Sequence, residues 1–558
     1  MRRALLVGVV AAVAIGVGGS GIGIAAPAKA VPSRQELAQK ILDSRAVMTA
    51  SARMGLEALA HQDIRRAAPD SAQIEQHGKQ LNSGQTDESQ HGLANVRVNN
   101  PAEDVLIDQT TQSETTIAVS GRTVVVGFND SARALPGPTV AALDLNGVAY
   151  SSDGGRTFTD AGFIPNSGGD FNLGDPWVAA DANGTFYYSS LVGDYVHGGQ
   201  FVGVSRSTSG GRTWSALAPL PTPPTTSPVY MADKDAMTAG PGTNVYATWD
   251  DFTYDPATLF PTFYSGLPVA HSSDGGQTWS TVYAARINMN PDASTGGCSF
   301  QQYIGAQPLR GPDGTLYLAA EKLMSVNPSC TFPPPSSQAV VAFASADGGQ
   351  TWSAETTIAA VTSSTQSSTF AGFFQLGPGS FMRNLEFPTL AGRGHTVYAT
   401  WNDGQGGHSH ILMSSSSDRG STWSNPTAVT AGNRDEIQPS ITADAAGLHV
   451  LYYQISTDTS GKGALNAMVS DSPDGTTWTA RRVTDRSFPG VLNVPQFDPI
   501  IVPGYMGDYI ASATDGSARY FAWGDNRDIV VNALWPQGRN DPNVYFAKDV
   551  SGDSNQQH

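Results

Sequence analysis

One short pattern recurs along this 558-residue chain and constrains its fold more than any other feature. The pattern reads S-x-D-G-G-x-T-W, and its third position falls at residues 153, 209, 274, 347, 418 and 474. Ser209 replaces the aspartate in one copy, Arg419 replaces the first glycine in another, and the copy around Asp474 is compressed. An aspartate followed by glycines predicts a tight turn, because the carboxylate accepts backbone N–H groups and glycine tolerates positive φ.

A second pattern places two short strand-like runs around a glycine-containing turn, which predicts a β-hairpin. Its seven copies begin at Glu114, Asp175, Asp235, Gln307, Phe387, Gln438 and Asp508. A hairpin with one box strand is too small to bury its own faces, so such units must stack on one another. Radial stacking predicts an all-β fold, a seven-bladed β-propeller, with six blades as the alternative. The last hairpin has no box, so its outer strand is expected from residues 95–99.

The composition agrees with a turn-rich β protein. The chain has 60 Gly and 35 Pro and only 15% charged residues, which disfavours a helical bundle. Its hydrophobic content of 40% is ample for a core. A formal charge of −17 argues against binding to nucleic acid or to an anionic membrane, since both need basic patches.

The N-terminus predicts export. Arg2 and Arg3 precede an apolar run, and Ala28-Lys29-Ala30 has the form of a signal-peptidase site. We therefore expect a signal peptide over residues 1–30, cleaved after Ala30, and a secreted protein with no membrane segment afterwards; a retained anchor is the alternative. Residues 31–95 are expected to form a helix followed by a polar linker, with an undetermined role.

The rest of the chain divides simply. Residues 96–548 are expected to form the propeller, and residues 549–558 a disordered tail. Cys298 and Cys330, the only cysteines, would form one disulfide in an oxidising compartment, while two free buried thiols are the alternative.

The boxes resemble the Asp-boxes of the sialidase-like, or BNR, propeller superfamily. The resemblance spans roughly residues 96–548, and it implies that the box aspartates are structural and lie at the blade periphery. These aspartates are Asp153, Asp274, Asp347, Asp418 and Asp474. The superfamily includes sialidases, other glycosidases, lyases and non-catalytic binding modules, so the fold alone does not define an activity.

A classical sialidase also has an F-R-I-P motif, whose arginine belongs to a triad that binds the substrate carboxylate. The motif is absent here. Two residues before the hairpin prolines stand Gly174, Ala306, Glu386 and Ile437. The resemblance therefore indicates a divergent member and does not predict classical exo-sialidase activity.

The hairpin starts carry the candidate functional residues, because in a propeller the innermost strands converge on one central channel. Converging carboxylates are what glycoside hydrolysis needs, one as acid and one as base or nucleophile. The candidate catalytic residues are Asp175 and Asp235 as acids, Glu386 and Glu436 as base or nucleophile, and Tyr509 in support. The candidate substrate-binding residues are Arg310, Arg383, Arg434, Trp177 and Asp508. The alternative is a structural role, in which these acids at the strand starts only bind backbone amides. Asp250, Asp251, Asp403 and Asp525 are expected to be solvated loop residues or cation ligands.

Two functions remain open at this stage. The first is a secreted glycosidase of sialidase-like type, and the second is a non-catalytic propeller that binds carbohydrate or protein of the cell envelope; whether the chain is an enzyme is undecided. The expected partner is a glycan or cell-envelope ligand, the expected state is a monomer, and no cofactor is expected apart from a structural cation such as calcium.

Overall fold

A computed structural model describes most of the chain after residue 91. The described residues are 92–103, 111–133, 144–165, 171–193, 200–222, 229–254, 264–288, 291–292, 297–327, 337–364, 373–377, 380–404, 407–457, 463–490, 506–531, 536 and 538–550. The predicted signal peptide, the predicted N-terminal helix with nearly all of its linker, and Cys330 lie outside these residues. No helix long and apolar enough to span a membrane occurs in the described parts of the chain.

The described structure is all-β, as predicted. Its one helical element is the short 3-10 helix η2 (Pro101–Glu103), and the other elements are strands. The seven predicted hairpins are all present and antiparallel. They are β2 (Gln112–Ser120) with β3 (Thr123–Arg133), β7 (Trp177–Ala180) with β8 (Phe186–Gly193), β11 (Val229–Ala239) with β12 (Val245–Tyr254), β16 (Gly297–Arg310) with β17 (Leu316–Asn327), β22 (Thr389–Arg393) with β23 (Thr396–Asp403), β26 (Asp435–Ala443) with β27 (Leu448–Thr457), and β31 (Ala511–Thr514) with β32 (Ala518–Val530).

Each hairpin is extended by a third and a fourth strand, and we call each set of four strands a unit, numbered 1 to 7 along the chain. The third and fourth strands of units 1 to 6 are β4 (Asp144–Ser151) and β5 (Thr159–Asp160), β9 (Gln200–Ser207) and β10 (Ala218–Pro219), β13 (Tyr264–Ser272) and β14 (Ser280–Asn288), β18 (Ser337–Ser345) and β19 (Thr356–Val361), β24 (His410–Ser416) and β25 (Thr427–Ala428), and β28 (Gly463–Ser472) and β29 (Thr479–Arg482). The short strands β6 (Phe171–Asn172), β15 (Pro291–Asp292), β20 (Phe373–Gly377), β21 (Ser380–Arg383) and β30 (Phe488–Pro489) decorate them.

Unit 7 is completed from the other end of the described chain. Its order is β31-β32-β33 (Arg539–Val550)-β1 (Asn95–Arg97), and Asn95, Val96 and Arg97 pair with Ala547, Phe546 and Tyr545. This confirms that residues near Asn95 supply the missing outer strand. β33 also runs to Val550, two residues beyond the boundary predicted at 548.

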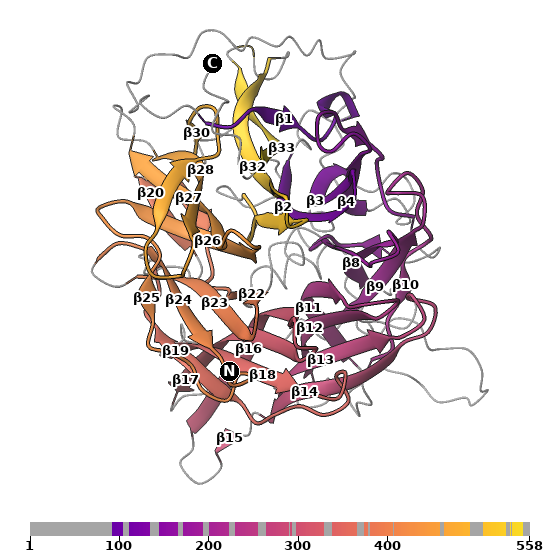
Figure 1. The fold of residues 1–558 in the computed structure, drawn as a ribbon, viewed down its shortest axis with the longest axis vertical. Helices are drawn as coiled ribbons and strands as arrows, with labels where there is room; N and C mark the ends of the chain where they lie inside the picture. Colours follow the sequence, from indigo (N-terminus) through magenta and orange to yellow (C-terminus); the bar gives the residue numbers. More distant parts are fainter. Residues whose placement is uncertain are drawn as a thin grey trace, which may run out of the picture.

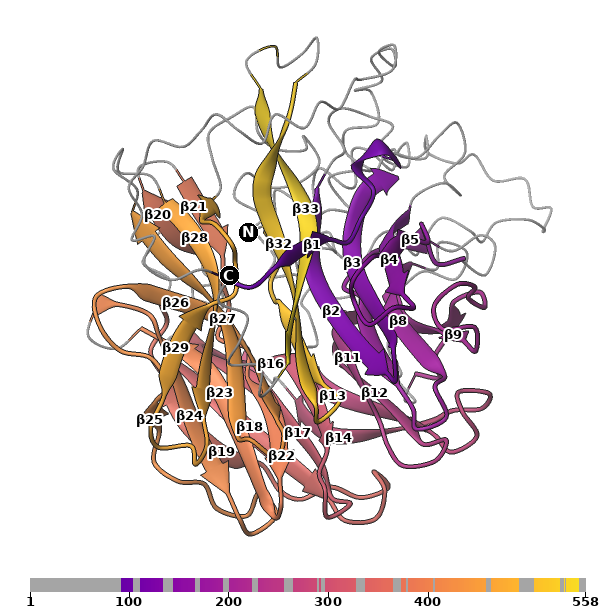
Figure 2. The same cartoon turned by 45° about the horizontal axis from the view of Figure 1, so that its top comes forward.

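The first strands of the units contact one another in sequence. β2 contacts β7, β7 contacts β11, and the series continues through β16, β22, β26 and β31, which returns to β2. Figure 1 shows the same order, with the sheets following one another around a centre until the last, yellow strands lie beside the first, indigo ones. Figure 2 shows that the sheets of neighbouring units lie side by side and are inclined to one another.

The core lies between units, as expected for sheets too small to fold alone. One cluster joins Leu451 and Tyr453 of unit 6 to Phe521 and Trp523 of unit 7, and another joins units 4 and 5 around Trp401. Trp249, Trp401 and Trp523, which lie on second strands, are fully buried. Burial of a side chain of this size is among the largest apolar contributions a residue makes.

The Asp-box carboxylates hold their own turns together. In the first box, Asp153 Oδ1 accepts from the backbone N–H of Arg156 and Thr157 at 2.9 and 3.1 Å, and its Oδ2 accepts from the Thr157 hydroxyl at 2.7 Å. The N–H of Gly154 then donates to the carbonyl of Arg122 in the hairpin turn of the same unit. The boxes therefore lie at the hairpin-turn end of the units, away from the strand starts.

The fifth box offers a test of its backbone geometry. Arg419 takes φ +62° where complete boxes have glycine, and left-handed backbone costs an L-residue roughly 1–2 kcal/mol. Its ion pair with Asp313 is solvent-exposed and contributes little. We expect Arg419→Gly to leave the free energy of unfolding equal or to raise it by up to about 1 kcal/mol. The matched reverse substitution, Gly348→Arg at φ +76°, is expected to lower it by about 1 kcal/mol. Urea unfolding of both variants measures this, and a clear loss of stability in Arg419→Gly would contradict it.

The boxes also predict an acid sensitivity. A hydrogen bond from the Thr422 hydroxyl lowers the pKa of Asp418 to about 2, and one from the Thr476 N–H lowers the pKa of Asp474 to about 2. A lowered carboxyl pKa contributes stability above the unfolded value near 3.9 and loses it as pH falls toward 2. The unfolding midpoint should therefore drop between pH 4 and pH 2. Asp418→Asn should flatten that drop while leaving the profile above pH 5 parallel to that of the wild type.

Candidate functional site

The strand starts share an unusual backbone conformation. Positive φ occurs at Glu114 (52°), Asp175 (56°), Lys234 (36°) and Gln438 (54°), and glycines 305 and 507 take it in two further units. In units 1, 3, 4 and 6 the same point is a shift in the register of the hairpin, which is a bulge. Left-handed conformations at non-glycine residues cost free energy and cluster at functional sites, so this end of the units is where a site is expected.

A repeated hydrogen bond holds these bulges. Asn129 Oδ1, at the end of β3, accepts the backbone N–H of Asp175 at 2.9 Å. Asp250 Oδ1 accepts the N–H of Gly305 at 3.2 Å, and Asn402 Oδ1 accepts the N–H of Gln438 at 3.3 Å. In each case a side chain of a second strand is hydrogen-bonded to the backbone at the start of the next unit.

Asp250 and its counterparts are therefore not solvated. Asp250, Asp251, Asp403 and Asp525 are fully buried, so the prediction of solvated loop residues was wrong. The reason is that protein groups replace water around them. Gly305 N–H donates to Asp250, the Tyr283 hydroxyl to Asp251 and Thr362 N–H to Asp403. Arg527 forms an ion pair with Asp525.

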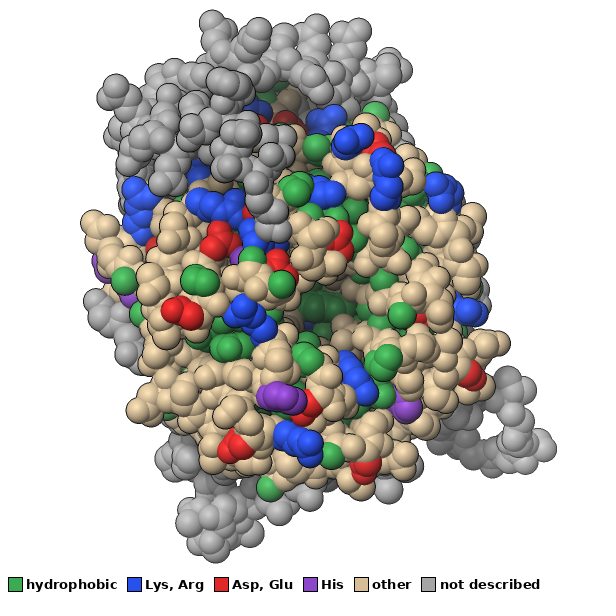
Figure 3. All heavy atoms as spheres, in the orientation of Figure 1, with side chains coloured by type: hydrophobic (Ala, Val, Ile, Leu, Met, Phe, Trp, Pro, Cys, Tyr) green, Lys and Arg blue, Asp and Glu red, His purple; other side chains and the backbone are tan. Residues whose placement is uncertain are grey.

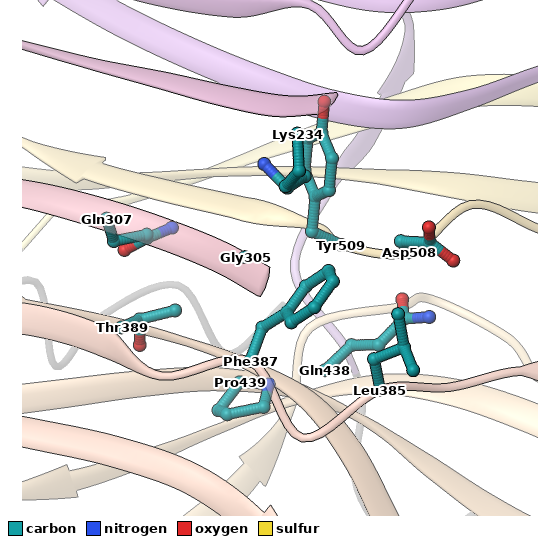
Figure 4. Close-up of a pocket in the computed structure, with 10 residues that line it drawn as sticks. All are labelled: Lys234, Gly305, Gln307, Leu385, Phe387, Thr389, Gln438, Pro439, Asp508 and Tyr509. Carbon is teal, nitrogen blue, oxygen red and sulfur yellow. The ribbon is translucent and has the colours of Figure 1, made fainter. Parts of the chain in front are cut away.

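A pocket opens where the bulged strand starts meet. Its empty volume is about 300 Å³ when the part open to solvent is included. Five units contribute to its lining, which consists of Lys234, Gly305, Gln307, Leu385, Phe387, Thr389, Gln438, Pro439, Asp508 and Tyr509. Figure 4 shows Lys234 and Tyr509 on one side and Phe387, Leu385 and Gln438 on the other. On the face seen in Figure 3, hydrophobic side chains line a hollow near the middle of the molecule.

Phe387 and Gly305 shape the wall of this pocket together. The Phe387 ring lies where a Cβ at Gly305 would have to be, and Gly305 has φ +69°. Only glycine satisfies both conditions. The aromatic face at this side of the pocket therefore depends on a residue with no side chain.

Lys234 is a pocket residue that the sequence reasoning missed. Its ammonium lies 4.0 Å from the centre of the Tyr509 ring and 4.8 Å from that of Trp177, and it donates to the carbonyl oxygen of Asp235 at 3.2 Å. Cation–π contacts of this kind gain strength when the cation is desolvated. A signal existed, since Lys234 directly precedes the predicted Asp235. The sequence does not show, however, that Trp177 and Tyr509 pack around this lysine.

Two of the predicted residues line the pocket and two more support it. Asp508 and Tyr509 line it, and the Tyr509 hydroxyl donates to the Pro176 carbonyl at 2.8 Å. Arg383, at the end of β21, forms a buried ion pair with Asp508 at 2.9 Å. Trp177 packs against Tyr509 with ring centres 5.6 Å apart.

The predicted acids Asp175 and Asp235 are fully buried beside this pocket, though neither belongs to its lining. The Ser189 hydroxyl donates to Asp235 Oδ2. Burial raises the pKa of Asp235 well above its usual range, with the nearby charge of Asp175 acting in the same direction.

Glu386 is held in a separate buried carboxyl pair. Its backbone N–H donates to Glu321 Oε2 at 3.1 Å, while its own Oε1 accepts from the N–H and the hydroxyl of Ser364, both at 2.8 Å. Burial raises the pKa of Glu386 to about 7 and raises that of Glu321 as well. Glu386 does not line the pocket.

Glu436 and Arg434 lie with units 5 and 6, away from the pocket lining. Glu436 Oε2 accepts from His410 at 2.8 Å and from Thr430 at 3.1 Å, and burial raises the pKa of this carboxyl. Arg434 is exposed and donates to Gln454.

Arg310 lies at the opposite end of its unit. It is the last residue of β16, beside Gly314 of the hairpin turn, where the Asp-boxes also lie. In the described residues no group of three or more His, Cys, Asp or Glu is arranged to hold a metal ion.

Comparison with known proteins identifies the repeat. The model of the BNR repeat-like domain matches residues 264–487. Residues 264–487 are therefore similar to a BNR repeat-like domain. This confirms the resemblance predicted from the Asp-boxes of a divergent sialidase-like protein. No curated protein matches the chain.

Several solved structures are similar to this chain at low identity. A protein of unknown function from Dyadobacter fermentans is 13% identical, with 82% of this chain and 98% of that one covered and a TM-score of 0.38. An α-L-arabinofuranosidase from Fusarium graminearum, in complex with an iminosugar inhibitor, is 13% identical over 70% of this chain and 97% of that one, with a TM-score of 0.39. A Trypanosoma rangeli sialidase is 14% identical over 71% and 55%, with a TM-score of 0.35.

The carboxyl pair of Glu386 predicts a second pH dependence. A raised carboxyl pKa contributes stability below the unfolded value near 4.3, and this stability is lost as pH rises toward 7. The thermal midpoint should therefore fall between pH 5 and pH 7. Glu386→Gln, which mimics the protonated acid, should make that fall shallower in calorimetry. Asp153→Asn serves as the contrast, because a hydrogen bond from Thr157 lowers the pKa of Asp153. This substitution should change the pH dependence of the thermal midpoint only below pH 4. An unchanged slope in Glu386→Gln would refute this role.

Proposed function

We propose that this protein is a secreted, seven-bladed β-propeller whose central pocket binds a sugar residue of an extracellular glycan. The seven units correspond to the blades, and the ring of contacts between first strands supports this closure. Export is supported by the sequence of residues 1–30. A Cys298–Cys330 disulfide and a monomeric state belong to the same proposal.

The observation that carries the proposal is the chemistry of the pocket lining. Aromatic faces from Phe387 and Tyr509 alternate with the hydrogen-bonding groups of Lys234, Gln438 and Asp508. Sugars have the same two-sided character, since their C–H faces pack on aromatic rings while their hydroxyls need donors and acceptors.

Binding is tested directly with a panel of methyl glycosides, including pentoses, hexoses, N-acetylated sugars, uronic acids and sialosides. At least one is expected to bind the mature protein in calorimetry or ligand-detected NMR. Lys234→Met should weaken that binding at least about tenfold, because it removes a donor to a ligand oxygen at a desolvated position. Arg310→Met is the matched control: it also removes one cation, at the Asp-box end, and should leave the affinity unchanged. A panel with no binder would refute the proposal.

Hydrolysis is the second candidate function, and one observation favours it. Burial shifts the pKa of Asp235 upward, which is the direction that a general acid needs. Fluorogenic glycosides of the same sugars test this candidate. Turnover that Asp235→Asn abolishes, with binding intact, supports hydrolysis. Turnover that persists in Asp235→Asn and in Glu386→Gln excludes the acids assigned here, and binding without turnover supports the non-catalytic function.

A further inference from the structure

Gln438 is placed in the pocket at a cost to the fold. It is 4% exposed, it has φ +54°, and it directly precedes Pro439. Left-handed backbone costs a non-glycine residue of order 1–3 kcal/mol, and a following proline narrows the permitted backbone further. Gln438 therefore occupies a conformation that the rest of the structure has to enforce.

The orientation of the Gln438 amide is determined by its surroundings. Nε2 donates to the Arg383 carbonyl at 3.1 Å and to the Gly507 carbonyl at 2.8 Å. Both partners are acceptors only, so the opposite orientation would set Oε1 against two carbonyl oxygens. The –NH₂ group thus faces the backbone of two other segments, and Oε1 takes the remaining direction.

No donor from the described residues reaches Gln438 Oε1, although this atom is buried. Leaving a buried acceptor unsatisfied costs about 1–3 kcal/mol. The residue lines the pocket, and Figure 4 shows its amide below Asp508 and Tyr509. The two bonds made by Nε2 account for a structural role of this side chain, but they leave the position of Oε1 without an explanation.

Lys234 supplies the complementary group on the other side of the pocket. Its ammonium has three N–H donors, and one of them is used by the Asp235 carbonyl. Its other neighbours are the faces of Trp177 and Tyr509, and no second oxygen acceptor among the described residues bonds to it. The pocket therefore presents an acceptor at Gln438 and a donor at Lys234 to the same small ligand.

We propose that Gln438 is a specificity-determining residue: its Oε1 accepts a hydrogen bond from a hydroxyl or N–H of the bound sugar, while Lys234 donates to an oxygen of that sugar. The inference rests on the proposed sugar binding and deepens it. The pocket then selects ligands that carry a hydrogen-bond donor at one defined ring position. An analogue that lacks this donor leaves Oε1 unsatisfied in the complex as well.

The test uses the methyl glycoside that binds the wild type best, together with its complete set of monodeoxy analogues. The wild-type protein should bind one of these analogues about five- to tenfold more weakly than the parent, as expected for one hydrogen bond. Gln438→Met keeps the length of the side chain and removes the acceptor. This variant should bind the parent glycoside and that analogue with equal affinity, about five- to tenfold below the wild type for the parent.

Asn402→Leu is the matched control. It removes the acceptor for the backbone N–H of Gln438 and leaves Oε1 unchanged. It should retain the wild-type ratio of affinities for parent and analogue, whatever happens to the affinities themselves. Loss of discrimination in Gln438→Met alone therefore reports on Oε1 and not on a general disturbance of the strand start.

Three results would overturn the inference. A wild type that binds every monodeoxy analogue as tightly as the parent overturns it without reference to any variant, and so decides the matter even where Gln438→Met does not fold. A Gln438→Met variant with the wild-type discrimination ratio also overturns it. Absence of binding by every glycoside overturns the proposed function itself, whereas binding without discrimination overturns only the role of Gln438.

Discussion

The arrangement depends on one repeated interaction, in which a polar side chain on a second strand accepts a backbone N–H from the next unit. Asn129, Asp250 and Asn402 each make this bond. A second series joins neighbouring first strands directly, where Thr116 Oγ1 accepts from Val178 and Thr389 Oγ1 accepts from Ile441. Buried backbone donors must be paired, so each unit becomes complete only when its neighbour is in place.

This dependence separates the two ends of the molecule. At the hairpin-turn end, the Asp-boxes bind their own backbone with short-range hydrogen bonds, and their geometry repeats from unit to unit. At the strand-start end, the bulges, the strained backbone and the carboxyls with raised pKa values are concentrated. Proteins tolerate such costs where a function depends on them. The contrast is the physical reason for assigning the pocket at the strand starts as the site.

The hairpins, the box turns and the closing strand β1 could all be read from the residues. Each is specified by signals close together in the sequence, such as Asp347-Gly348-Gly349, or by the alternation of a strand. The pocket was predictable only in part. Asp508 and Tyr509 were found because they open a hairpin, whereas Lys234 and Gln438 open hairpins too and were not assigned to the site. Arg310 was assigned to the site but lies at the opposite end of its unit. Its place in the hairpin sequence did not say which end of the strand it occupies.

The sequence by itself determined the repeat: its turns, its hairpins and the likeness to BNR proteins, because these follow from contacts within a few residues. Only the tertiary structure decided which strand starts meet. It also decided that the buried side chain of Glu321 contacts Glu386, and that Lys234 lies against the rings of Trp177 and Tyr509. Those outcomes depend on the position of each unit relative to the next, and the hydrogen bonds and packing that set this position join residues far apart in the chain.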